Sequence, residues 1–251
     1  MVLTNLKPMR ISRFYLPQPL SSGATVQLEE ESAHYLRTVL RLKKGAELIV
    51  FNGEGGEYPA TLLAAHKEAV SVALGEHRPH ETESHLNTSL GLGISRSERM
   101  DLAIQKAVEL GVSGITPLFA ERCVVQLDDD ARKLQRLRHW RKVAQSACEQ
   151  SGRNRLPEIF EPMQLSDWAA RQSGLRLFLD PGGAKTLREL PRPEDAVCLL
   201  SGPEGGFTSQ ERTLALAAGF IALRLGPRVL RTETAALAAL SAIQTLWGDL
   251  G

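Results

Sequence analysis

Two glycine-rich stretches decide the fold: LLSGPEGGFTSQE (residues 199–211) and LRLGPRVLRTETAALAAL (residues 223–240). Each opens with apolar residues typical of a buried strand, passes through a loop that contains glycine, and leads into a helical pattern. Thr208 and Glu211 have the spacing of a capping box, which marks the start of a helix. This repetition of strand, loop and helix is typical of a parallel sheet that is covered by helices.

The same alternation extends outward from these stretches through most of the second part of the chain. Ser97 can cap a helix that Gly111 ends, and the acids at 128–130 suit the start of a long helix. We expect strands at residues 89–94, 114–119, 175–180, 196–200 and 221–225, and helices at 97–110, from 128–130 to about 150, at 165–172, from 208 onward and at 232–247.

The first part of the chain has a different texture. Short β-type segments are expected at residues 11–16, 24–28, 47–51, 58–63 and 69–74, with one helix at 30–41, which together predict a small barrel. A polar segment with Pro79 and three histidines follows. We therefore expect a disordered extension over residues 1–8, a barrel over 9–75, a linker over 76–86 and an α/β domain over 87–251.

Composition places the chain among globular proteins. Of its 251 residues, 43% are hydrophobic and 24% are charged. No apolar run is long enough to span a membrane and no signal segment is visible, so we expect a cytoplasmic protein. Its cysteines, Cys123, Cys148 and Cys198, form no CxxC pair, and its histidines have no metal-binding spacing. Reduced thiols and the absence of a metal site are expected.

Basic residues gather in two clusters although the net charge is only +1. One cluster lies between residues 132 and 155 and has a single acid, Glu149; the other includes Lys7, Arg13, Lys43 and Lys44. Such clusters are either solvated faces or surfaces that meet an anionic partner, and composition leaves both readings open.

The glycine-rich loops follow strands, and ligands of open α/β sheets bind beyond the carboxyl ends of the strands. The loop at residues 202–206 lacks the GK[ST] of a phosphate loop and the GxGxxG of a dinucleotide site. Its glycines allow a ligand to approach the backbone closely, although a plain turn also explains them. Glu233 either favours the positive end of a helix or faces a ligand.

Together the two opening stretches resemble the adenosylmethionine-binding knot of the SPOUT methyltransferases. SRSERMDLAIQKAVELGVSGITPLFAERC (95–123) and WRKVAQSACEQSGRNRLPEI (140–159) resemble the ribosomal RNA small subunit methyltransferase E family, which forms N3-methyluridine in 16S ribosomal RNA. RISRFYLPQPL (10–20) and HYLRTVLRLKKG (34–45) fit the same family. The resemblance covers residues 9–251.

The resemblance implies a PUA-like β-barrel followed by a trefoil-knotted α/β domain, in a homodimer that uses S-adenosyl-L-methionine on 16S ribosomal RNA of the small subunit. It places the methyl donor among three loops. The residues implied for donor binding are Leu179, Asp180, Leu200, Gly202, Pro203, Glu204, Gly205, Gly206, Leu223, Leu225, Gly226, Val229, Leu230, Arg231, Thr234 and Ala235.

Methylation at N3 of uracil requires loss of the N3 proton, and the resulting charge spreads to O2 and O4. We hypothesise that Arg231 stabilises this charge electrostatically, and that Glu233 or Glu204 accepts the proton or holds the arginine. Because N3 lies on the Watson–Crick edge, the base must be unpaired. The residues favoured for RNA binding are Arg10, Arg13, Arg37, Arg41, Arg96, Arg99, Arg122, Arg153, Asn154 and Arg155, although some of them are expected to form structural ion pairs.

Two rival functions use the same residues: an RNA-binding assembly factor without catalysis, and a SPOUT methyltransferase that acts on another RNA. The glycine loops argue against the first, because a pure binder needs no ligand cradle. The alanine-rich final helix suits either a dimer contact or packing within one chain.

Overall fold

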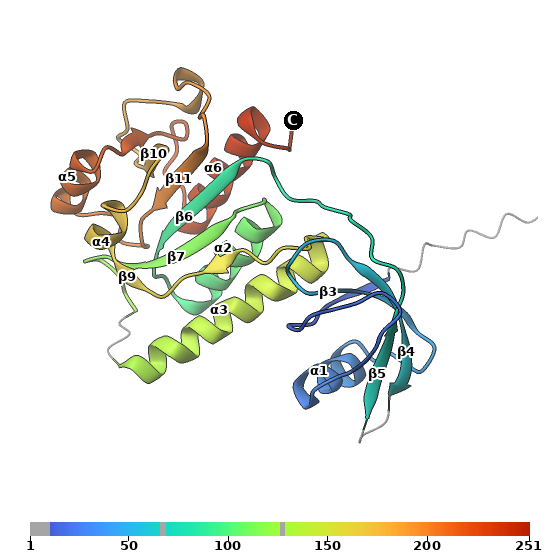
Figure 1. The fold of residues 1–251 in the computed structure, drawn as a ribbon. Coiled ribbons are helices and arrows are strands. Elements are labelled where there is room, and N and C mark those ends of the chain that lie inside the picture. The colour runs from blue at the N-terminus through green and yellow to red at the C-terminus, as the bar shows by residue number, and fades with distance from the viewer. Residues whose placement is uncertain (1–10, 66–68, 126–128) are drawn as a thin grey trace, which may run out of the picture. The chain divides into compact units, whose positions relative to one another are not determined.

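The computed structural model describes residues 11–65, 69–125 and 129–251 (Figure 1). The chain divides into two compact units. The N-terminal unit contains Met1–Glu83 and Cys148–Leu156, and the C-terminal unit contains Ser84–Ala147 and Pro157–Gly251. This division differs from the sequence-based one because residues 148–156 belong to the N-terminal unit. The extension expected at residues 1–8 lies outside the described residues.

The N-terminal unit is built on a five-stranded sheet with the order β1 (Ser12–Tyr15), β3 (Glu47–Phe51), β4 (Tyr58–Ala65), β5 (Val70–Leu74) and β2 (Thr25–Gln27). The β1–β3 pair is parallel and the other pairs are antiparallel. The expected β-type segments are strands, and in β5 buried residues alternate with half-buried ones, whereas four successive residues of β3 are buried. The core includes Phe14, Leu48, Val50, Leu62 and Val72.

The prediction of one continuous helix over residues 30–41 is wrong for the second half of this range. The chain forms α1 (Glu30–His34), and then the π-helix η1 (Tyr35–Val39). Arg41 follows in the left-handed region with a φ of 53°. The wider turn keeps Leu36 fully buried while the chain reverses, and the Leu42 N–H donates to the Leu36 carbonyl at 3.0 Å. Such π-turns and left-handed residues cost free energy and often mark functional segments.

The C-terminal unit contains a sheet with the order β12 (Ile221–Leu223), β10 (Leu175–Leu179), β11 (Ala196–Ser201), β6 (Asn87–Gly93), β7 (Gly114–Phe119) and β8 (Glu158–Ile159). The short strand β9 (Met163–Gln164) also pairs with β7. All of these pairs are parallel, as the alternation of strand and helix predicts. The carboxyl ends of the strands therefore lie at one edge.

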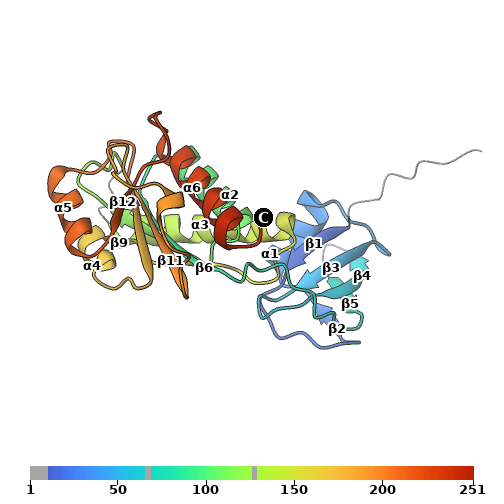
Figure 2. The same cartoon turned by 90° about the horizontal axis from the view of Figure 1, so that it is seen from above.

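Helices cover both faces of this sheet (Figure 2). On one side α2 (Ser97–Glu109) packs against α6 (Thr232–Trp247), which also contacts β11. On the other side α4 (Leu165–Ala169) packs against α5 (Ser209–Ala217). Cys198 and Leu200 of β11 share a core with Trp168 of α4, and the intervening Leu199 points to the opposite face. A 3₁₀-turn, η2 (Leu187–Glu189), precedes β11.

The long helix α3 (Asp130–Ser151) ends within the N-terminal unit. There Glu149 accepts hydrogen bonds from the Tyr15 N–H and the Tyr35 hydroxyl, both at 3.1 Å. Burial, together with the charge and hydrogen bond of Glu149, raises the pKa of Tyr35 to about 12. The residues after α3 continue the network: Arg153 is ion-paired with Glu83 at 2.5 Å. This segment is part of the framework of the N-terminal unit.

Candidate functional site

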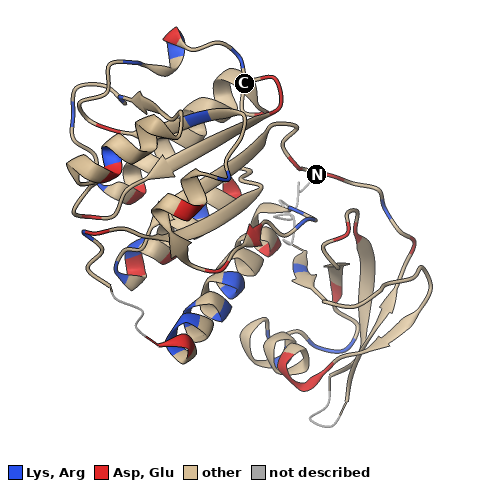
Figure 3. Ribbon diagram, turned by 60° about the vertical axis from the view of Figure 1, so that its left-hand side comes forward, with Lys and Arg blue, Asp and Glu red and all other residues tan. Residues whose placement is uncertain are grey.

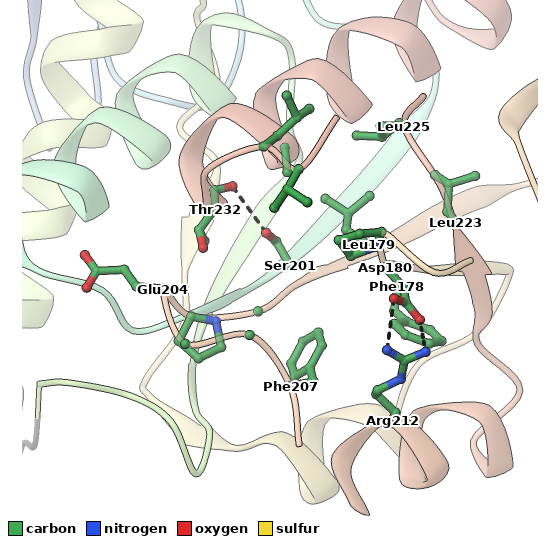
Figure 4. A pocket seen from close by; sticks show the side chains of 18 of the residues that line it. Phe178, Leu179, Asp180, Ser201, Glu204, Phe207, Arg212, Leu223, Leu225 and Thr232 are labelled. Carbon is green, nitrogen blue, oxygen red and sulfur yellow. Dashed lines mark hydrogen bonds and ion pairs between the residues drawn. The ribbon is translucent and has the colours of Figure 1, made fainter. Parts of the chain in front are cut away.

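A cavity of about 350 Å³ lies in the C-terminal unit where β10, β11 and β12 end (Figure 4). This volume is at the lower end of the range for small-molecule sites. The first loop after β10 contributes Asp180 and Pro181, the second is the glycine-rich loop after β11, and the third joins β12 to α6. The expectation that a ligand site forms beyond the carboxyl ends of the strands fits this geometry.

The glycine-rich loop is held close to the loop that follows β7. Arg122 donates from Nη1 to the Gly205 carbonyl at 3.2 Å, and a Cβ on Gly205 would lie 2.7 Å from the Cβ of Arg122. Gly93, at the end of β6, faces the backbone of Pro203 so closely that a Cβ would collide with it. Gly206 has a φ of +68°, which favours glycine. Each of these glycines therefore has a steric or conformational reason to be present.

The third loop closes the apolar part of the cavity. Leu179, Leu223 and Leu225 line this part together with Leu230. The loop is joined to β11 by the Ser201 hydroxyl, which donates to the Thr232 carbonyl at 3.4 Å. An apolar wall with backbone groups close by can receive a flat ring such as a nucleobase.

A charged pair forms a polar part of the cavity beside Leu179 and Leu223, where the Asp180 N–H donates to the Leu223 carbonyl at 3.0 Å (Figure 4). The carboxylate of Asp180, only 3% exposed, contacts both terminal nitrogens of Arg212: Nη1 lies 3.1 Å from Oδ1, and Nη2 lies 2.5 Å from Oδ2. Gly182 also donates its N–H to Oδ1 at 2.9 Å. Sequence reasoning named Asp180 but missed Arg212.

The start of α5, which carries Arg212, is fixed from two sides. The predicted capping box is confirmed, because Glu211 and Thr208 exchange hydrogen bonds of 2.8 and 3.2 Å. The other oxygen of Glu211 accepts the Glu121 N–H at 2.8 Å. One carboxylate therefore joins the first turn of α5 to the loop after β7.

The three candidate catalytic residues occupy different environments. Glu204 lines the cavity and pairs with Arg99 of α2 at 2.8 Å. Glu233 is 9% exposed, does not line the cavity, and its buried Oε2 has no hydrogen-bond partner among the described residues. Arg231 is the exposed residue at the N-cap of α6, and its carbonyl accepts the Ala235 N–H at 2.8 Å. The structure thus brings only Glu204 of the three to the wall.

Most of the residues implied for donor binding line this cavity. Leu200 is instead buried in the core beside α4, and Thr234 and Arg231 are exposed on or beside the first turn of α6. Pro181, Ser201, Arg228 and Thr232 also line the cavity and lie within the three implied loops, at residues 179–182, 200–206 and 223–235; the wall residues outside those loops are Arg122, Phe178, Phe207 and Arg212. Their positions next to glycine loops were the only signal available.

Several residues expected to bind RNA are engaged within the N-terminal unit. Arg13 contacts Glu57 at 2.5 Å and also donates to the Asn154 side chain. The Asn154 amide donates to the His80 carbonyl at 2.6 Å. Arg153 is 6% exposed at its side chain, and the exposed Arg155 lies 3.7 Å from Glu81. These contacts give the segment at residues 152–156 a structural role.

The other candidates differ in exposure. Arg37 is half-buried and its Nε donates to the Ala33 carbonyl at 3.3 Å. Arg41 and Arg96 are exposed, whereas Arg99 is occupied by Glu204 and Arg122 by Gly205. Arg10 lies outside the described residues.

The three cysteines are free thiols. Burial raises the pKa of Cys148 and that of Cys198 to about 12, and it also raises the pKa of Cys123. Among the described residues, no group of three His, Cys, Asp or Glu side chains is arranged to hold a metal ion. Within the same residues, every helix is too short or too polar to cross a membrane.

The sequence matches two families of known domains. Residues 82–244 match the RNA methyltransferase domain, and residues 28–74 match the RNA methyltransferase PUA domain. Ribosomal RNA small subunit methyltransferase E of Buchnera aphidicola subsp. Schizaphis graminum is 37% identical over 243 residues, which cover 96% of this chain and 98% of that protein. The Bacillus subtilis protein of the same name is 30% identical, with coverage of 90% and 92%.

Solved structures agree with this likeness over nearly the whole chain. A methyltransferase from Legionella pneumophila, solved in complex with the bound cofactor SAM, is 40% identical with a TM-score of 0.92, and the match covers 96% of this chain and all of that one. Ribosomal RNA small subunit methyltransferase E of Neisseria gonorrhoeae, bound to S-adenosyl methionine, is 39% identical with a TM-score of 0.89 and the same coverage.

Proposed function

The chain belongs to the ribosomal RNA small subunit methyltransferase E family, and from this premise we propose that it methylates N3 of a uridine in 16S ribosomal RNA with S-adenosylmethionine as donor. The observation that carries the proposal is the cavity at the ends of β10, β11 and β12. Relatives that match over nearly the full chain were solved with this donor bound. We further propose that the protein acts in the cytoplasm.

The residues of the cavity fit the proposed donor. Leu179, Leu223 and Leu225 offer an apolar wall for an adenine ring, and Gly206, beside which the space for a Cβ is open, allows close approach to the backbone. Asp180 and Arg212 provide charge where the ribose and amino-acid portions need polar partners. When bound, the donor supplies an electrophilic methyl group on a positive sulfonium.

The chain itself must hold the base and remove the N3 proton. We propose that Glu204 accepts this proton, because of the three candidates it alone lines the cavity in the described structure. Arg99 holds the Glu204 side chain in place through their ion pair. Arg231, exposed at the start of α6, would approach a uracil carbonyl oxygen from the solvent side and stabilise the negative charge that develops there.

An RNA substrate is supported by the distribution of basic residues. Figure 3 shows Lys and Arg along much of α3, and Arg132, Arg138, Arg141 and Lys142 of this helix are exposed. Arg41 and Arg96 are exposed elsewhere in the chain. Arginine side chains contact phosphates in a planar, bidentate manner and position RNA without reading its sequence.

We also propose the finer features that the family resemblance implies: a closed barrel in the N-terminal unit, a trefoil knot formed by the loops at residues 179–182, 200–206 and 223–235, and a homodimer. In support of the dimer, α6 exposes Thr234, Ala238, Thr245 and Leu246, which are mostly small residues that allow a second helix to pack closely. Size-exclusion chromatography with light scattering of the wild type and of Ala238→Glu tests this. A dimer that the variant converts to monomer is expected, and a monomeric wild type would refute the proposal.

The decisive experiment incubates the purified protein with labelled S-adenosylmethionine and small ribosomal subunits from a strain that lacks the modification. The RNA is then digested to nucleosides and analysed by mass spectrometry. N3-methyluridine that forms only with enzyme is the expected result. No transfer despite donor binding would point to another RNA substrate, and no donor binding would favour an assembly factor without catalysis.

A further inference from the structure

The buried carboxylate of Asp180 needs a positively charged partner within the cavity. Its side chain is 3% exposed, and a buried carboxylate is destabilising unless it is paired and hydrogen-bonded. Arg212 meets this requirement through two nitrogen–oxygen contacts, and Gly182 contributes one N–H. The two charged residues are 32 positions apart and come from different elements, so the fold creates this pair.

The two members of the pair differ in accessibility. Arg212 is 45% exposed at its side chain, whereas Asp180 is almost fully covered. A guanidinium has five N–H donors; Nη1 of Arg212 donates to Oδ1 of Asp180, and Nη2 lies against Oδ2 as an ion pair. The remaining donors, on Nε and on the outer sides of Nη1 and Nη2, are left for a second acceptor. The accessible partner for a ligand is therefore the arginine.

Arg212 is also more firmly positioned than the other cationic side chains of the cavity wall. Its backbone lies in the capped first turn of α5, and its guanidinium is oriented by a buried carboxylate. Arg122 is exposed and donates to a backbone carbonyl, and Arg228 is exposed in the loop between β12 and α6. A fixed guanidinium loses less freedom when it binds than a mobile one.

The donor carries one anionic group, the carboxylate of its methionine portion. A carboxylate matches the planar fork of a guanidinium and forms short, charge-assisted hydrogen bonds with it. We infer that Arg212 binds the donor carboxylate, and that Asp180 is a positioning residue that aims the Arg212 guanidinium. The inference rests on the proposed donor. It adds the residue that distinguishes a nucleoside with an amino-acid group from a nucleoside without one.

The test compares two ligands that differ only in this group: S-adenosylmethionine and its decarboxylated form. Isothermal titration calorimetry gives the ratio of their dissociation constants. For the wild type, the intact donor should bind about 10- to 100-fold more tightly, which corresponds to one or two hydrogen bonds to a charged group. For Arg212→Gln the ratio should fall to roughly threefold or less, because the variant weakens only the intact donor.

Further variants separate recognition from simple structural damage. Arg212→Lys keeps the charge but not the fork, and should retain an intermediate ratio. Asp180→Asn should also lower the ratio, because Arg212 loses the group that aims it. The matched control is Arg224→Gln, an exposed arginine outside the cavity wall, which should keep the wild-type ratio. Arg228→Gln tests the other exposed arginine in the loop between β12 and α6. Thermal melting confirms that each variant is folded.

The outcomes distinguish this inference from the proposed function. If the wild type prefers the intact donor and Arg212→Gln keeps that preference, Arg212 does not read the carboxylate, although the proposed function stands. If Arg228→Gln lowers the ratio of dissociation constants and Arg212→Gln does not, the contact with the donor carboxylate belongs to Arg228, and the inference is overturned. An equal loss for both ligands in Arg212→Gln would show a structural role only. A wild type that binds neither ligand would overturn the proposed function as well.

Discussion

Oε1 of Glu204 lies 2.8 Å from Nη1 of Arg99, and the two side chains are 15% and 37% exposed. This pair joins the glycine-rich loop to the first turn of α2. We expect Glu204→Gln to lower the rate of methyl transfer about 100-fold or more, because glutamine cannot accept the N3 proton. Donor affinity should change little. Arg99→Gln keeps the Glu204 carboxylate but removes its ion-pair partner, so it should slow methyl transfer less. A normal rate of transfer in Glu204→Gln would show that another group removes the N3 proton.

Arg231→Ala should abolish most turnover while donor binding persists. The arginine is exposed at the N-cap of α6, where it can reach a bound base without forming the wall of the donor cavity. Loss of one group that stabilises an oxyanion costs about 100- to 1,000-fold in turnover. Single-turnover kinetics and calorimetry measure the two effects. Arg224→Ala, an exposed arginine of the same segment, is the control, and near-normal turnover in Arg231→Ala would refute the role.

Arg41 should contribute to RNA affinity through a phosphate contact. It is exposed and has a φ of 53°, a conformation that asparagine tolerates better than most residues. Arg41→Asn should therefore keep its thermal stability and lose one charge at the surface. In a salt titration of binding to small ribosomal subunits, the slope of log K against log salt should fall by about 1. An unchanged slope would place Arg41 outside the RNA interface.

Arg153 should matter for stability more than for RNA binding. Its side chain is 6% exposed and pairs with Glu83, so removing it leaves a partly buried carboxylate without its partner. Arg153→Gln should lower the free energy of unfolding by roughly 3 kcal/mol, as measured by urea denaturation. The salt slope of RNA binding should match that of the wild type. A stable variant with a lower slope would instead identify Arg153 as a phosphate contact.

Tyr35 should ionise late in an alkaline titration. Burial and Glu149 raise its pKa to about 12, above the value of about 10 expected in an unfolded chain. Because the folded pKa is the higher one, the contribution of Tyr35 to stability is complete below about pH 10 and is lost as the pH rises toward 12. Tyrosinate absorbance should show a late step that Tyr35→Phe removes and Tyr58→Phe retains. A wild type without this step would contradict the buried contact with Glu149.

The sequence was sufficient for five strands of the sheet in the C-terminal unit because each of them carries its own apolar pattern, but it missed β8 and β9, which have two residues each and are too short to show a pattern. The capping box of Thr208 and Glu211 could be predicted for the same reason, since its residues are three apart. Arg212 could not, because its partner Asp180 is remote in sequence and an arginine in the first turn of a helix is ordinarily a surface residue. The π-helix after His34 was missed because its apolar spacing resembles that of an α-helix.

Charge patterns were the least informative part of the sequence. Arg13, Arg153 and Asn154 have the composition of an RNA-binding surface, yet each lies in a network of contacts within the N-terminal unit. Their partners, Glu57, Glu83 and the His80 carbonyl, come from distant positions. In the sequence, an ion-paired basic residue cannot be told from a free one, because its acidic partner comes close only in the folded chain.

The membership of residues 148–156 in the N-terminal unit has a consequence for the order of biosynthesis. Arg13 and Glu83 leave the ribosome well before Asn154 and Arg153, so the first unit to emerge lacks part of its framework for much of translation. Domains generally fold as they emerge, but this one cannot be completed until α3 has been made. A chain that stops between residues 83 and 148 would release an unfinished unit. The C-terminal unit has to wait longer still, because its helix α6 is the last element to be made.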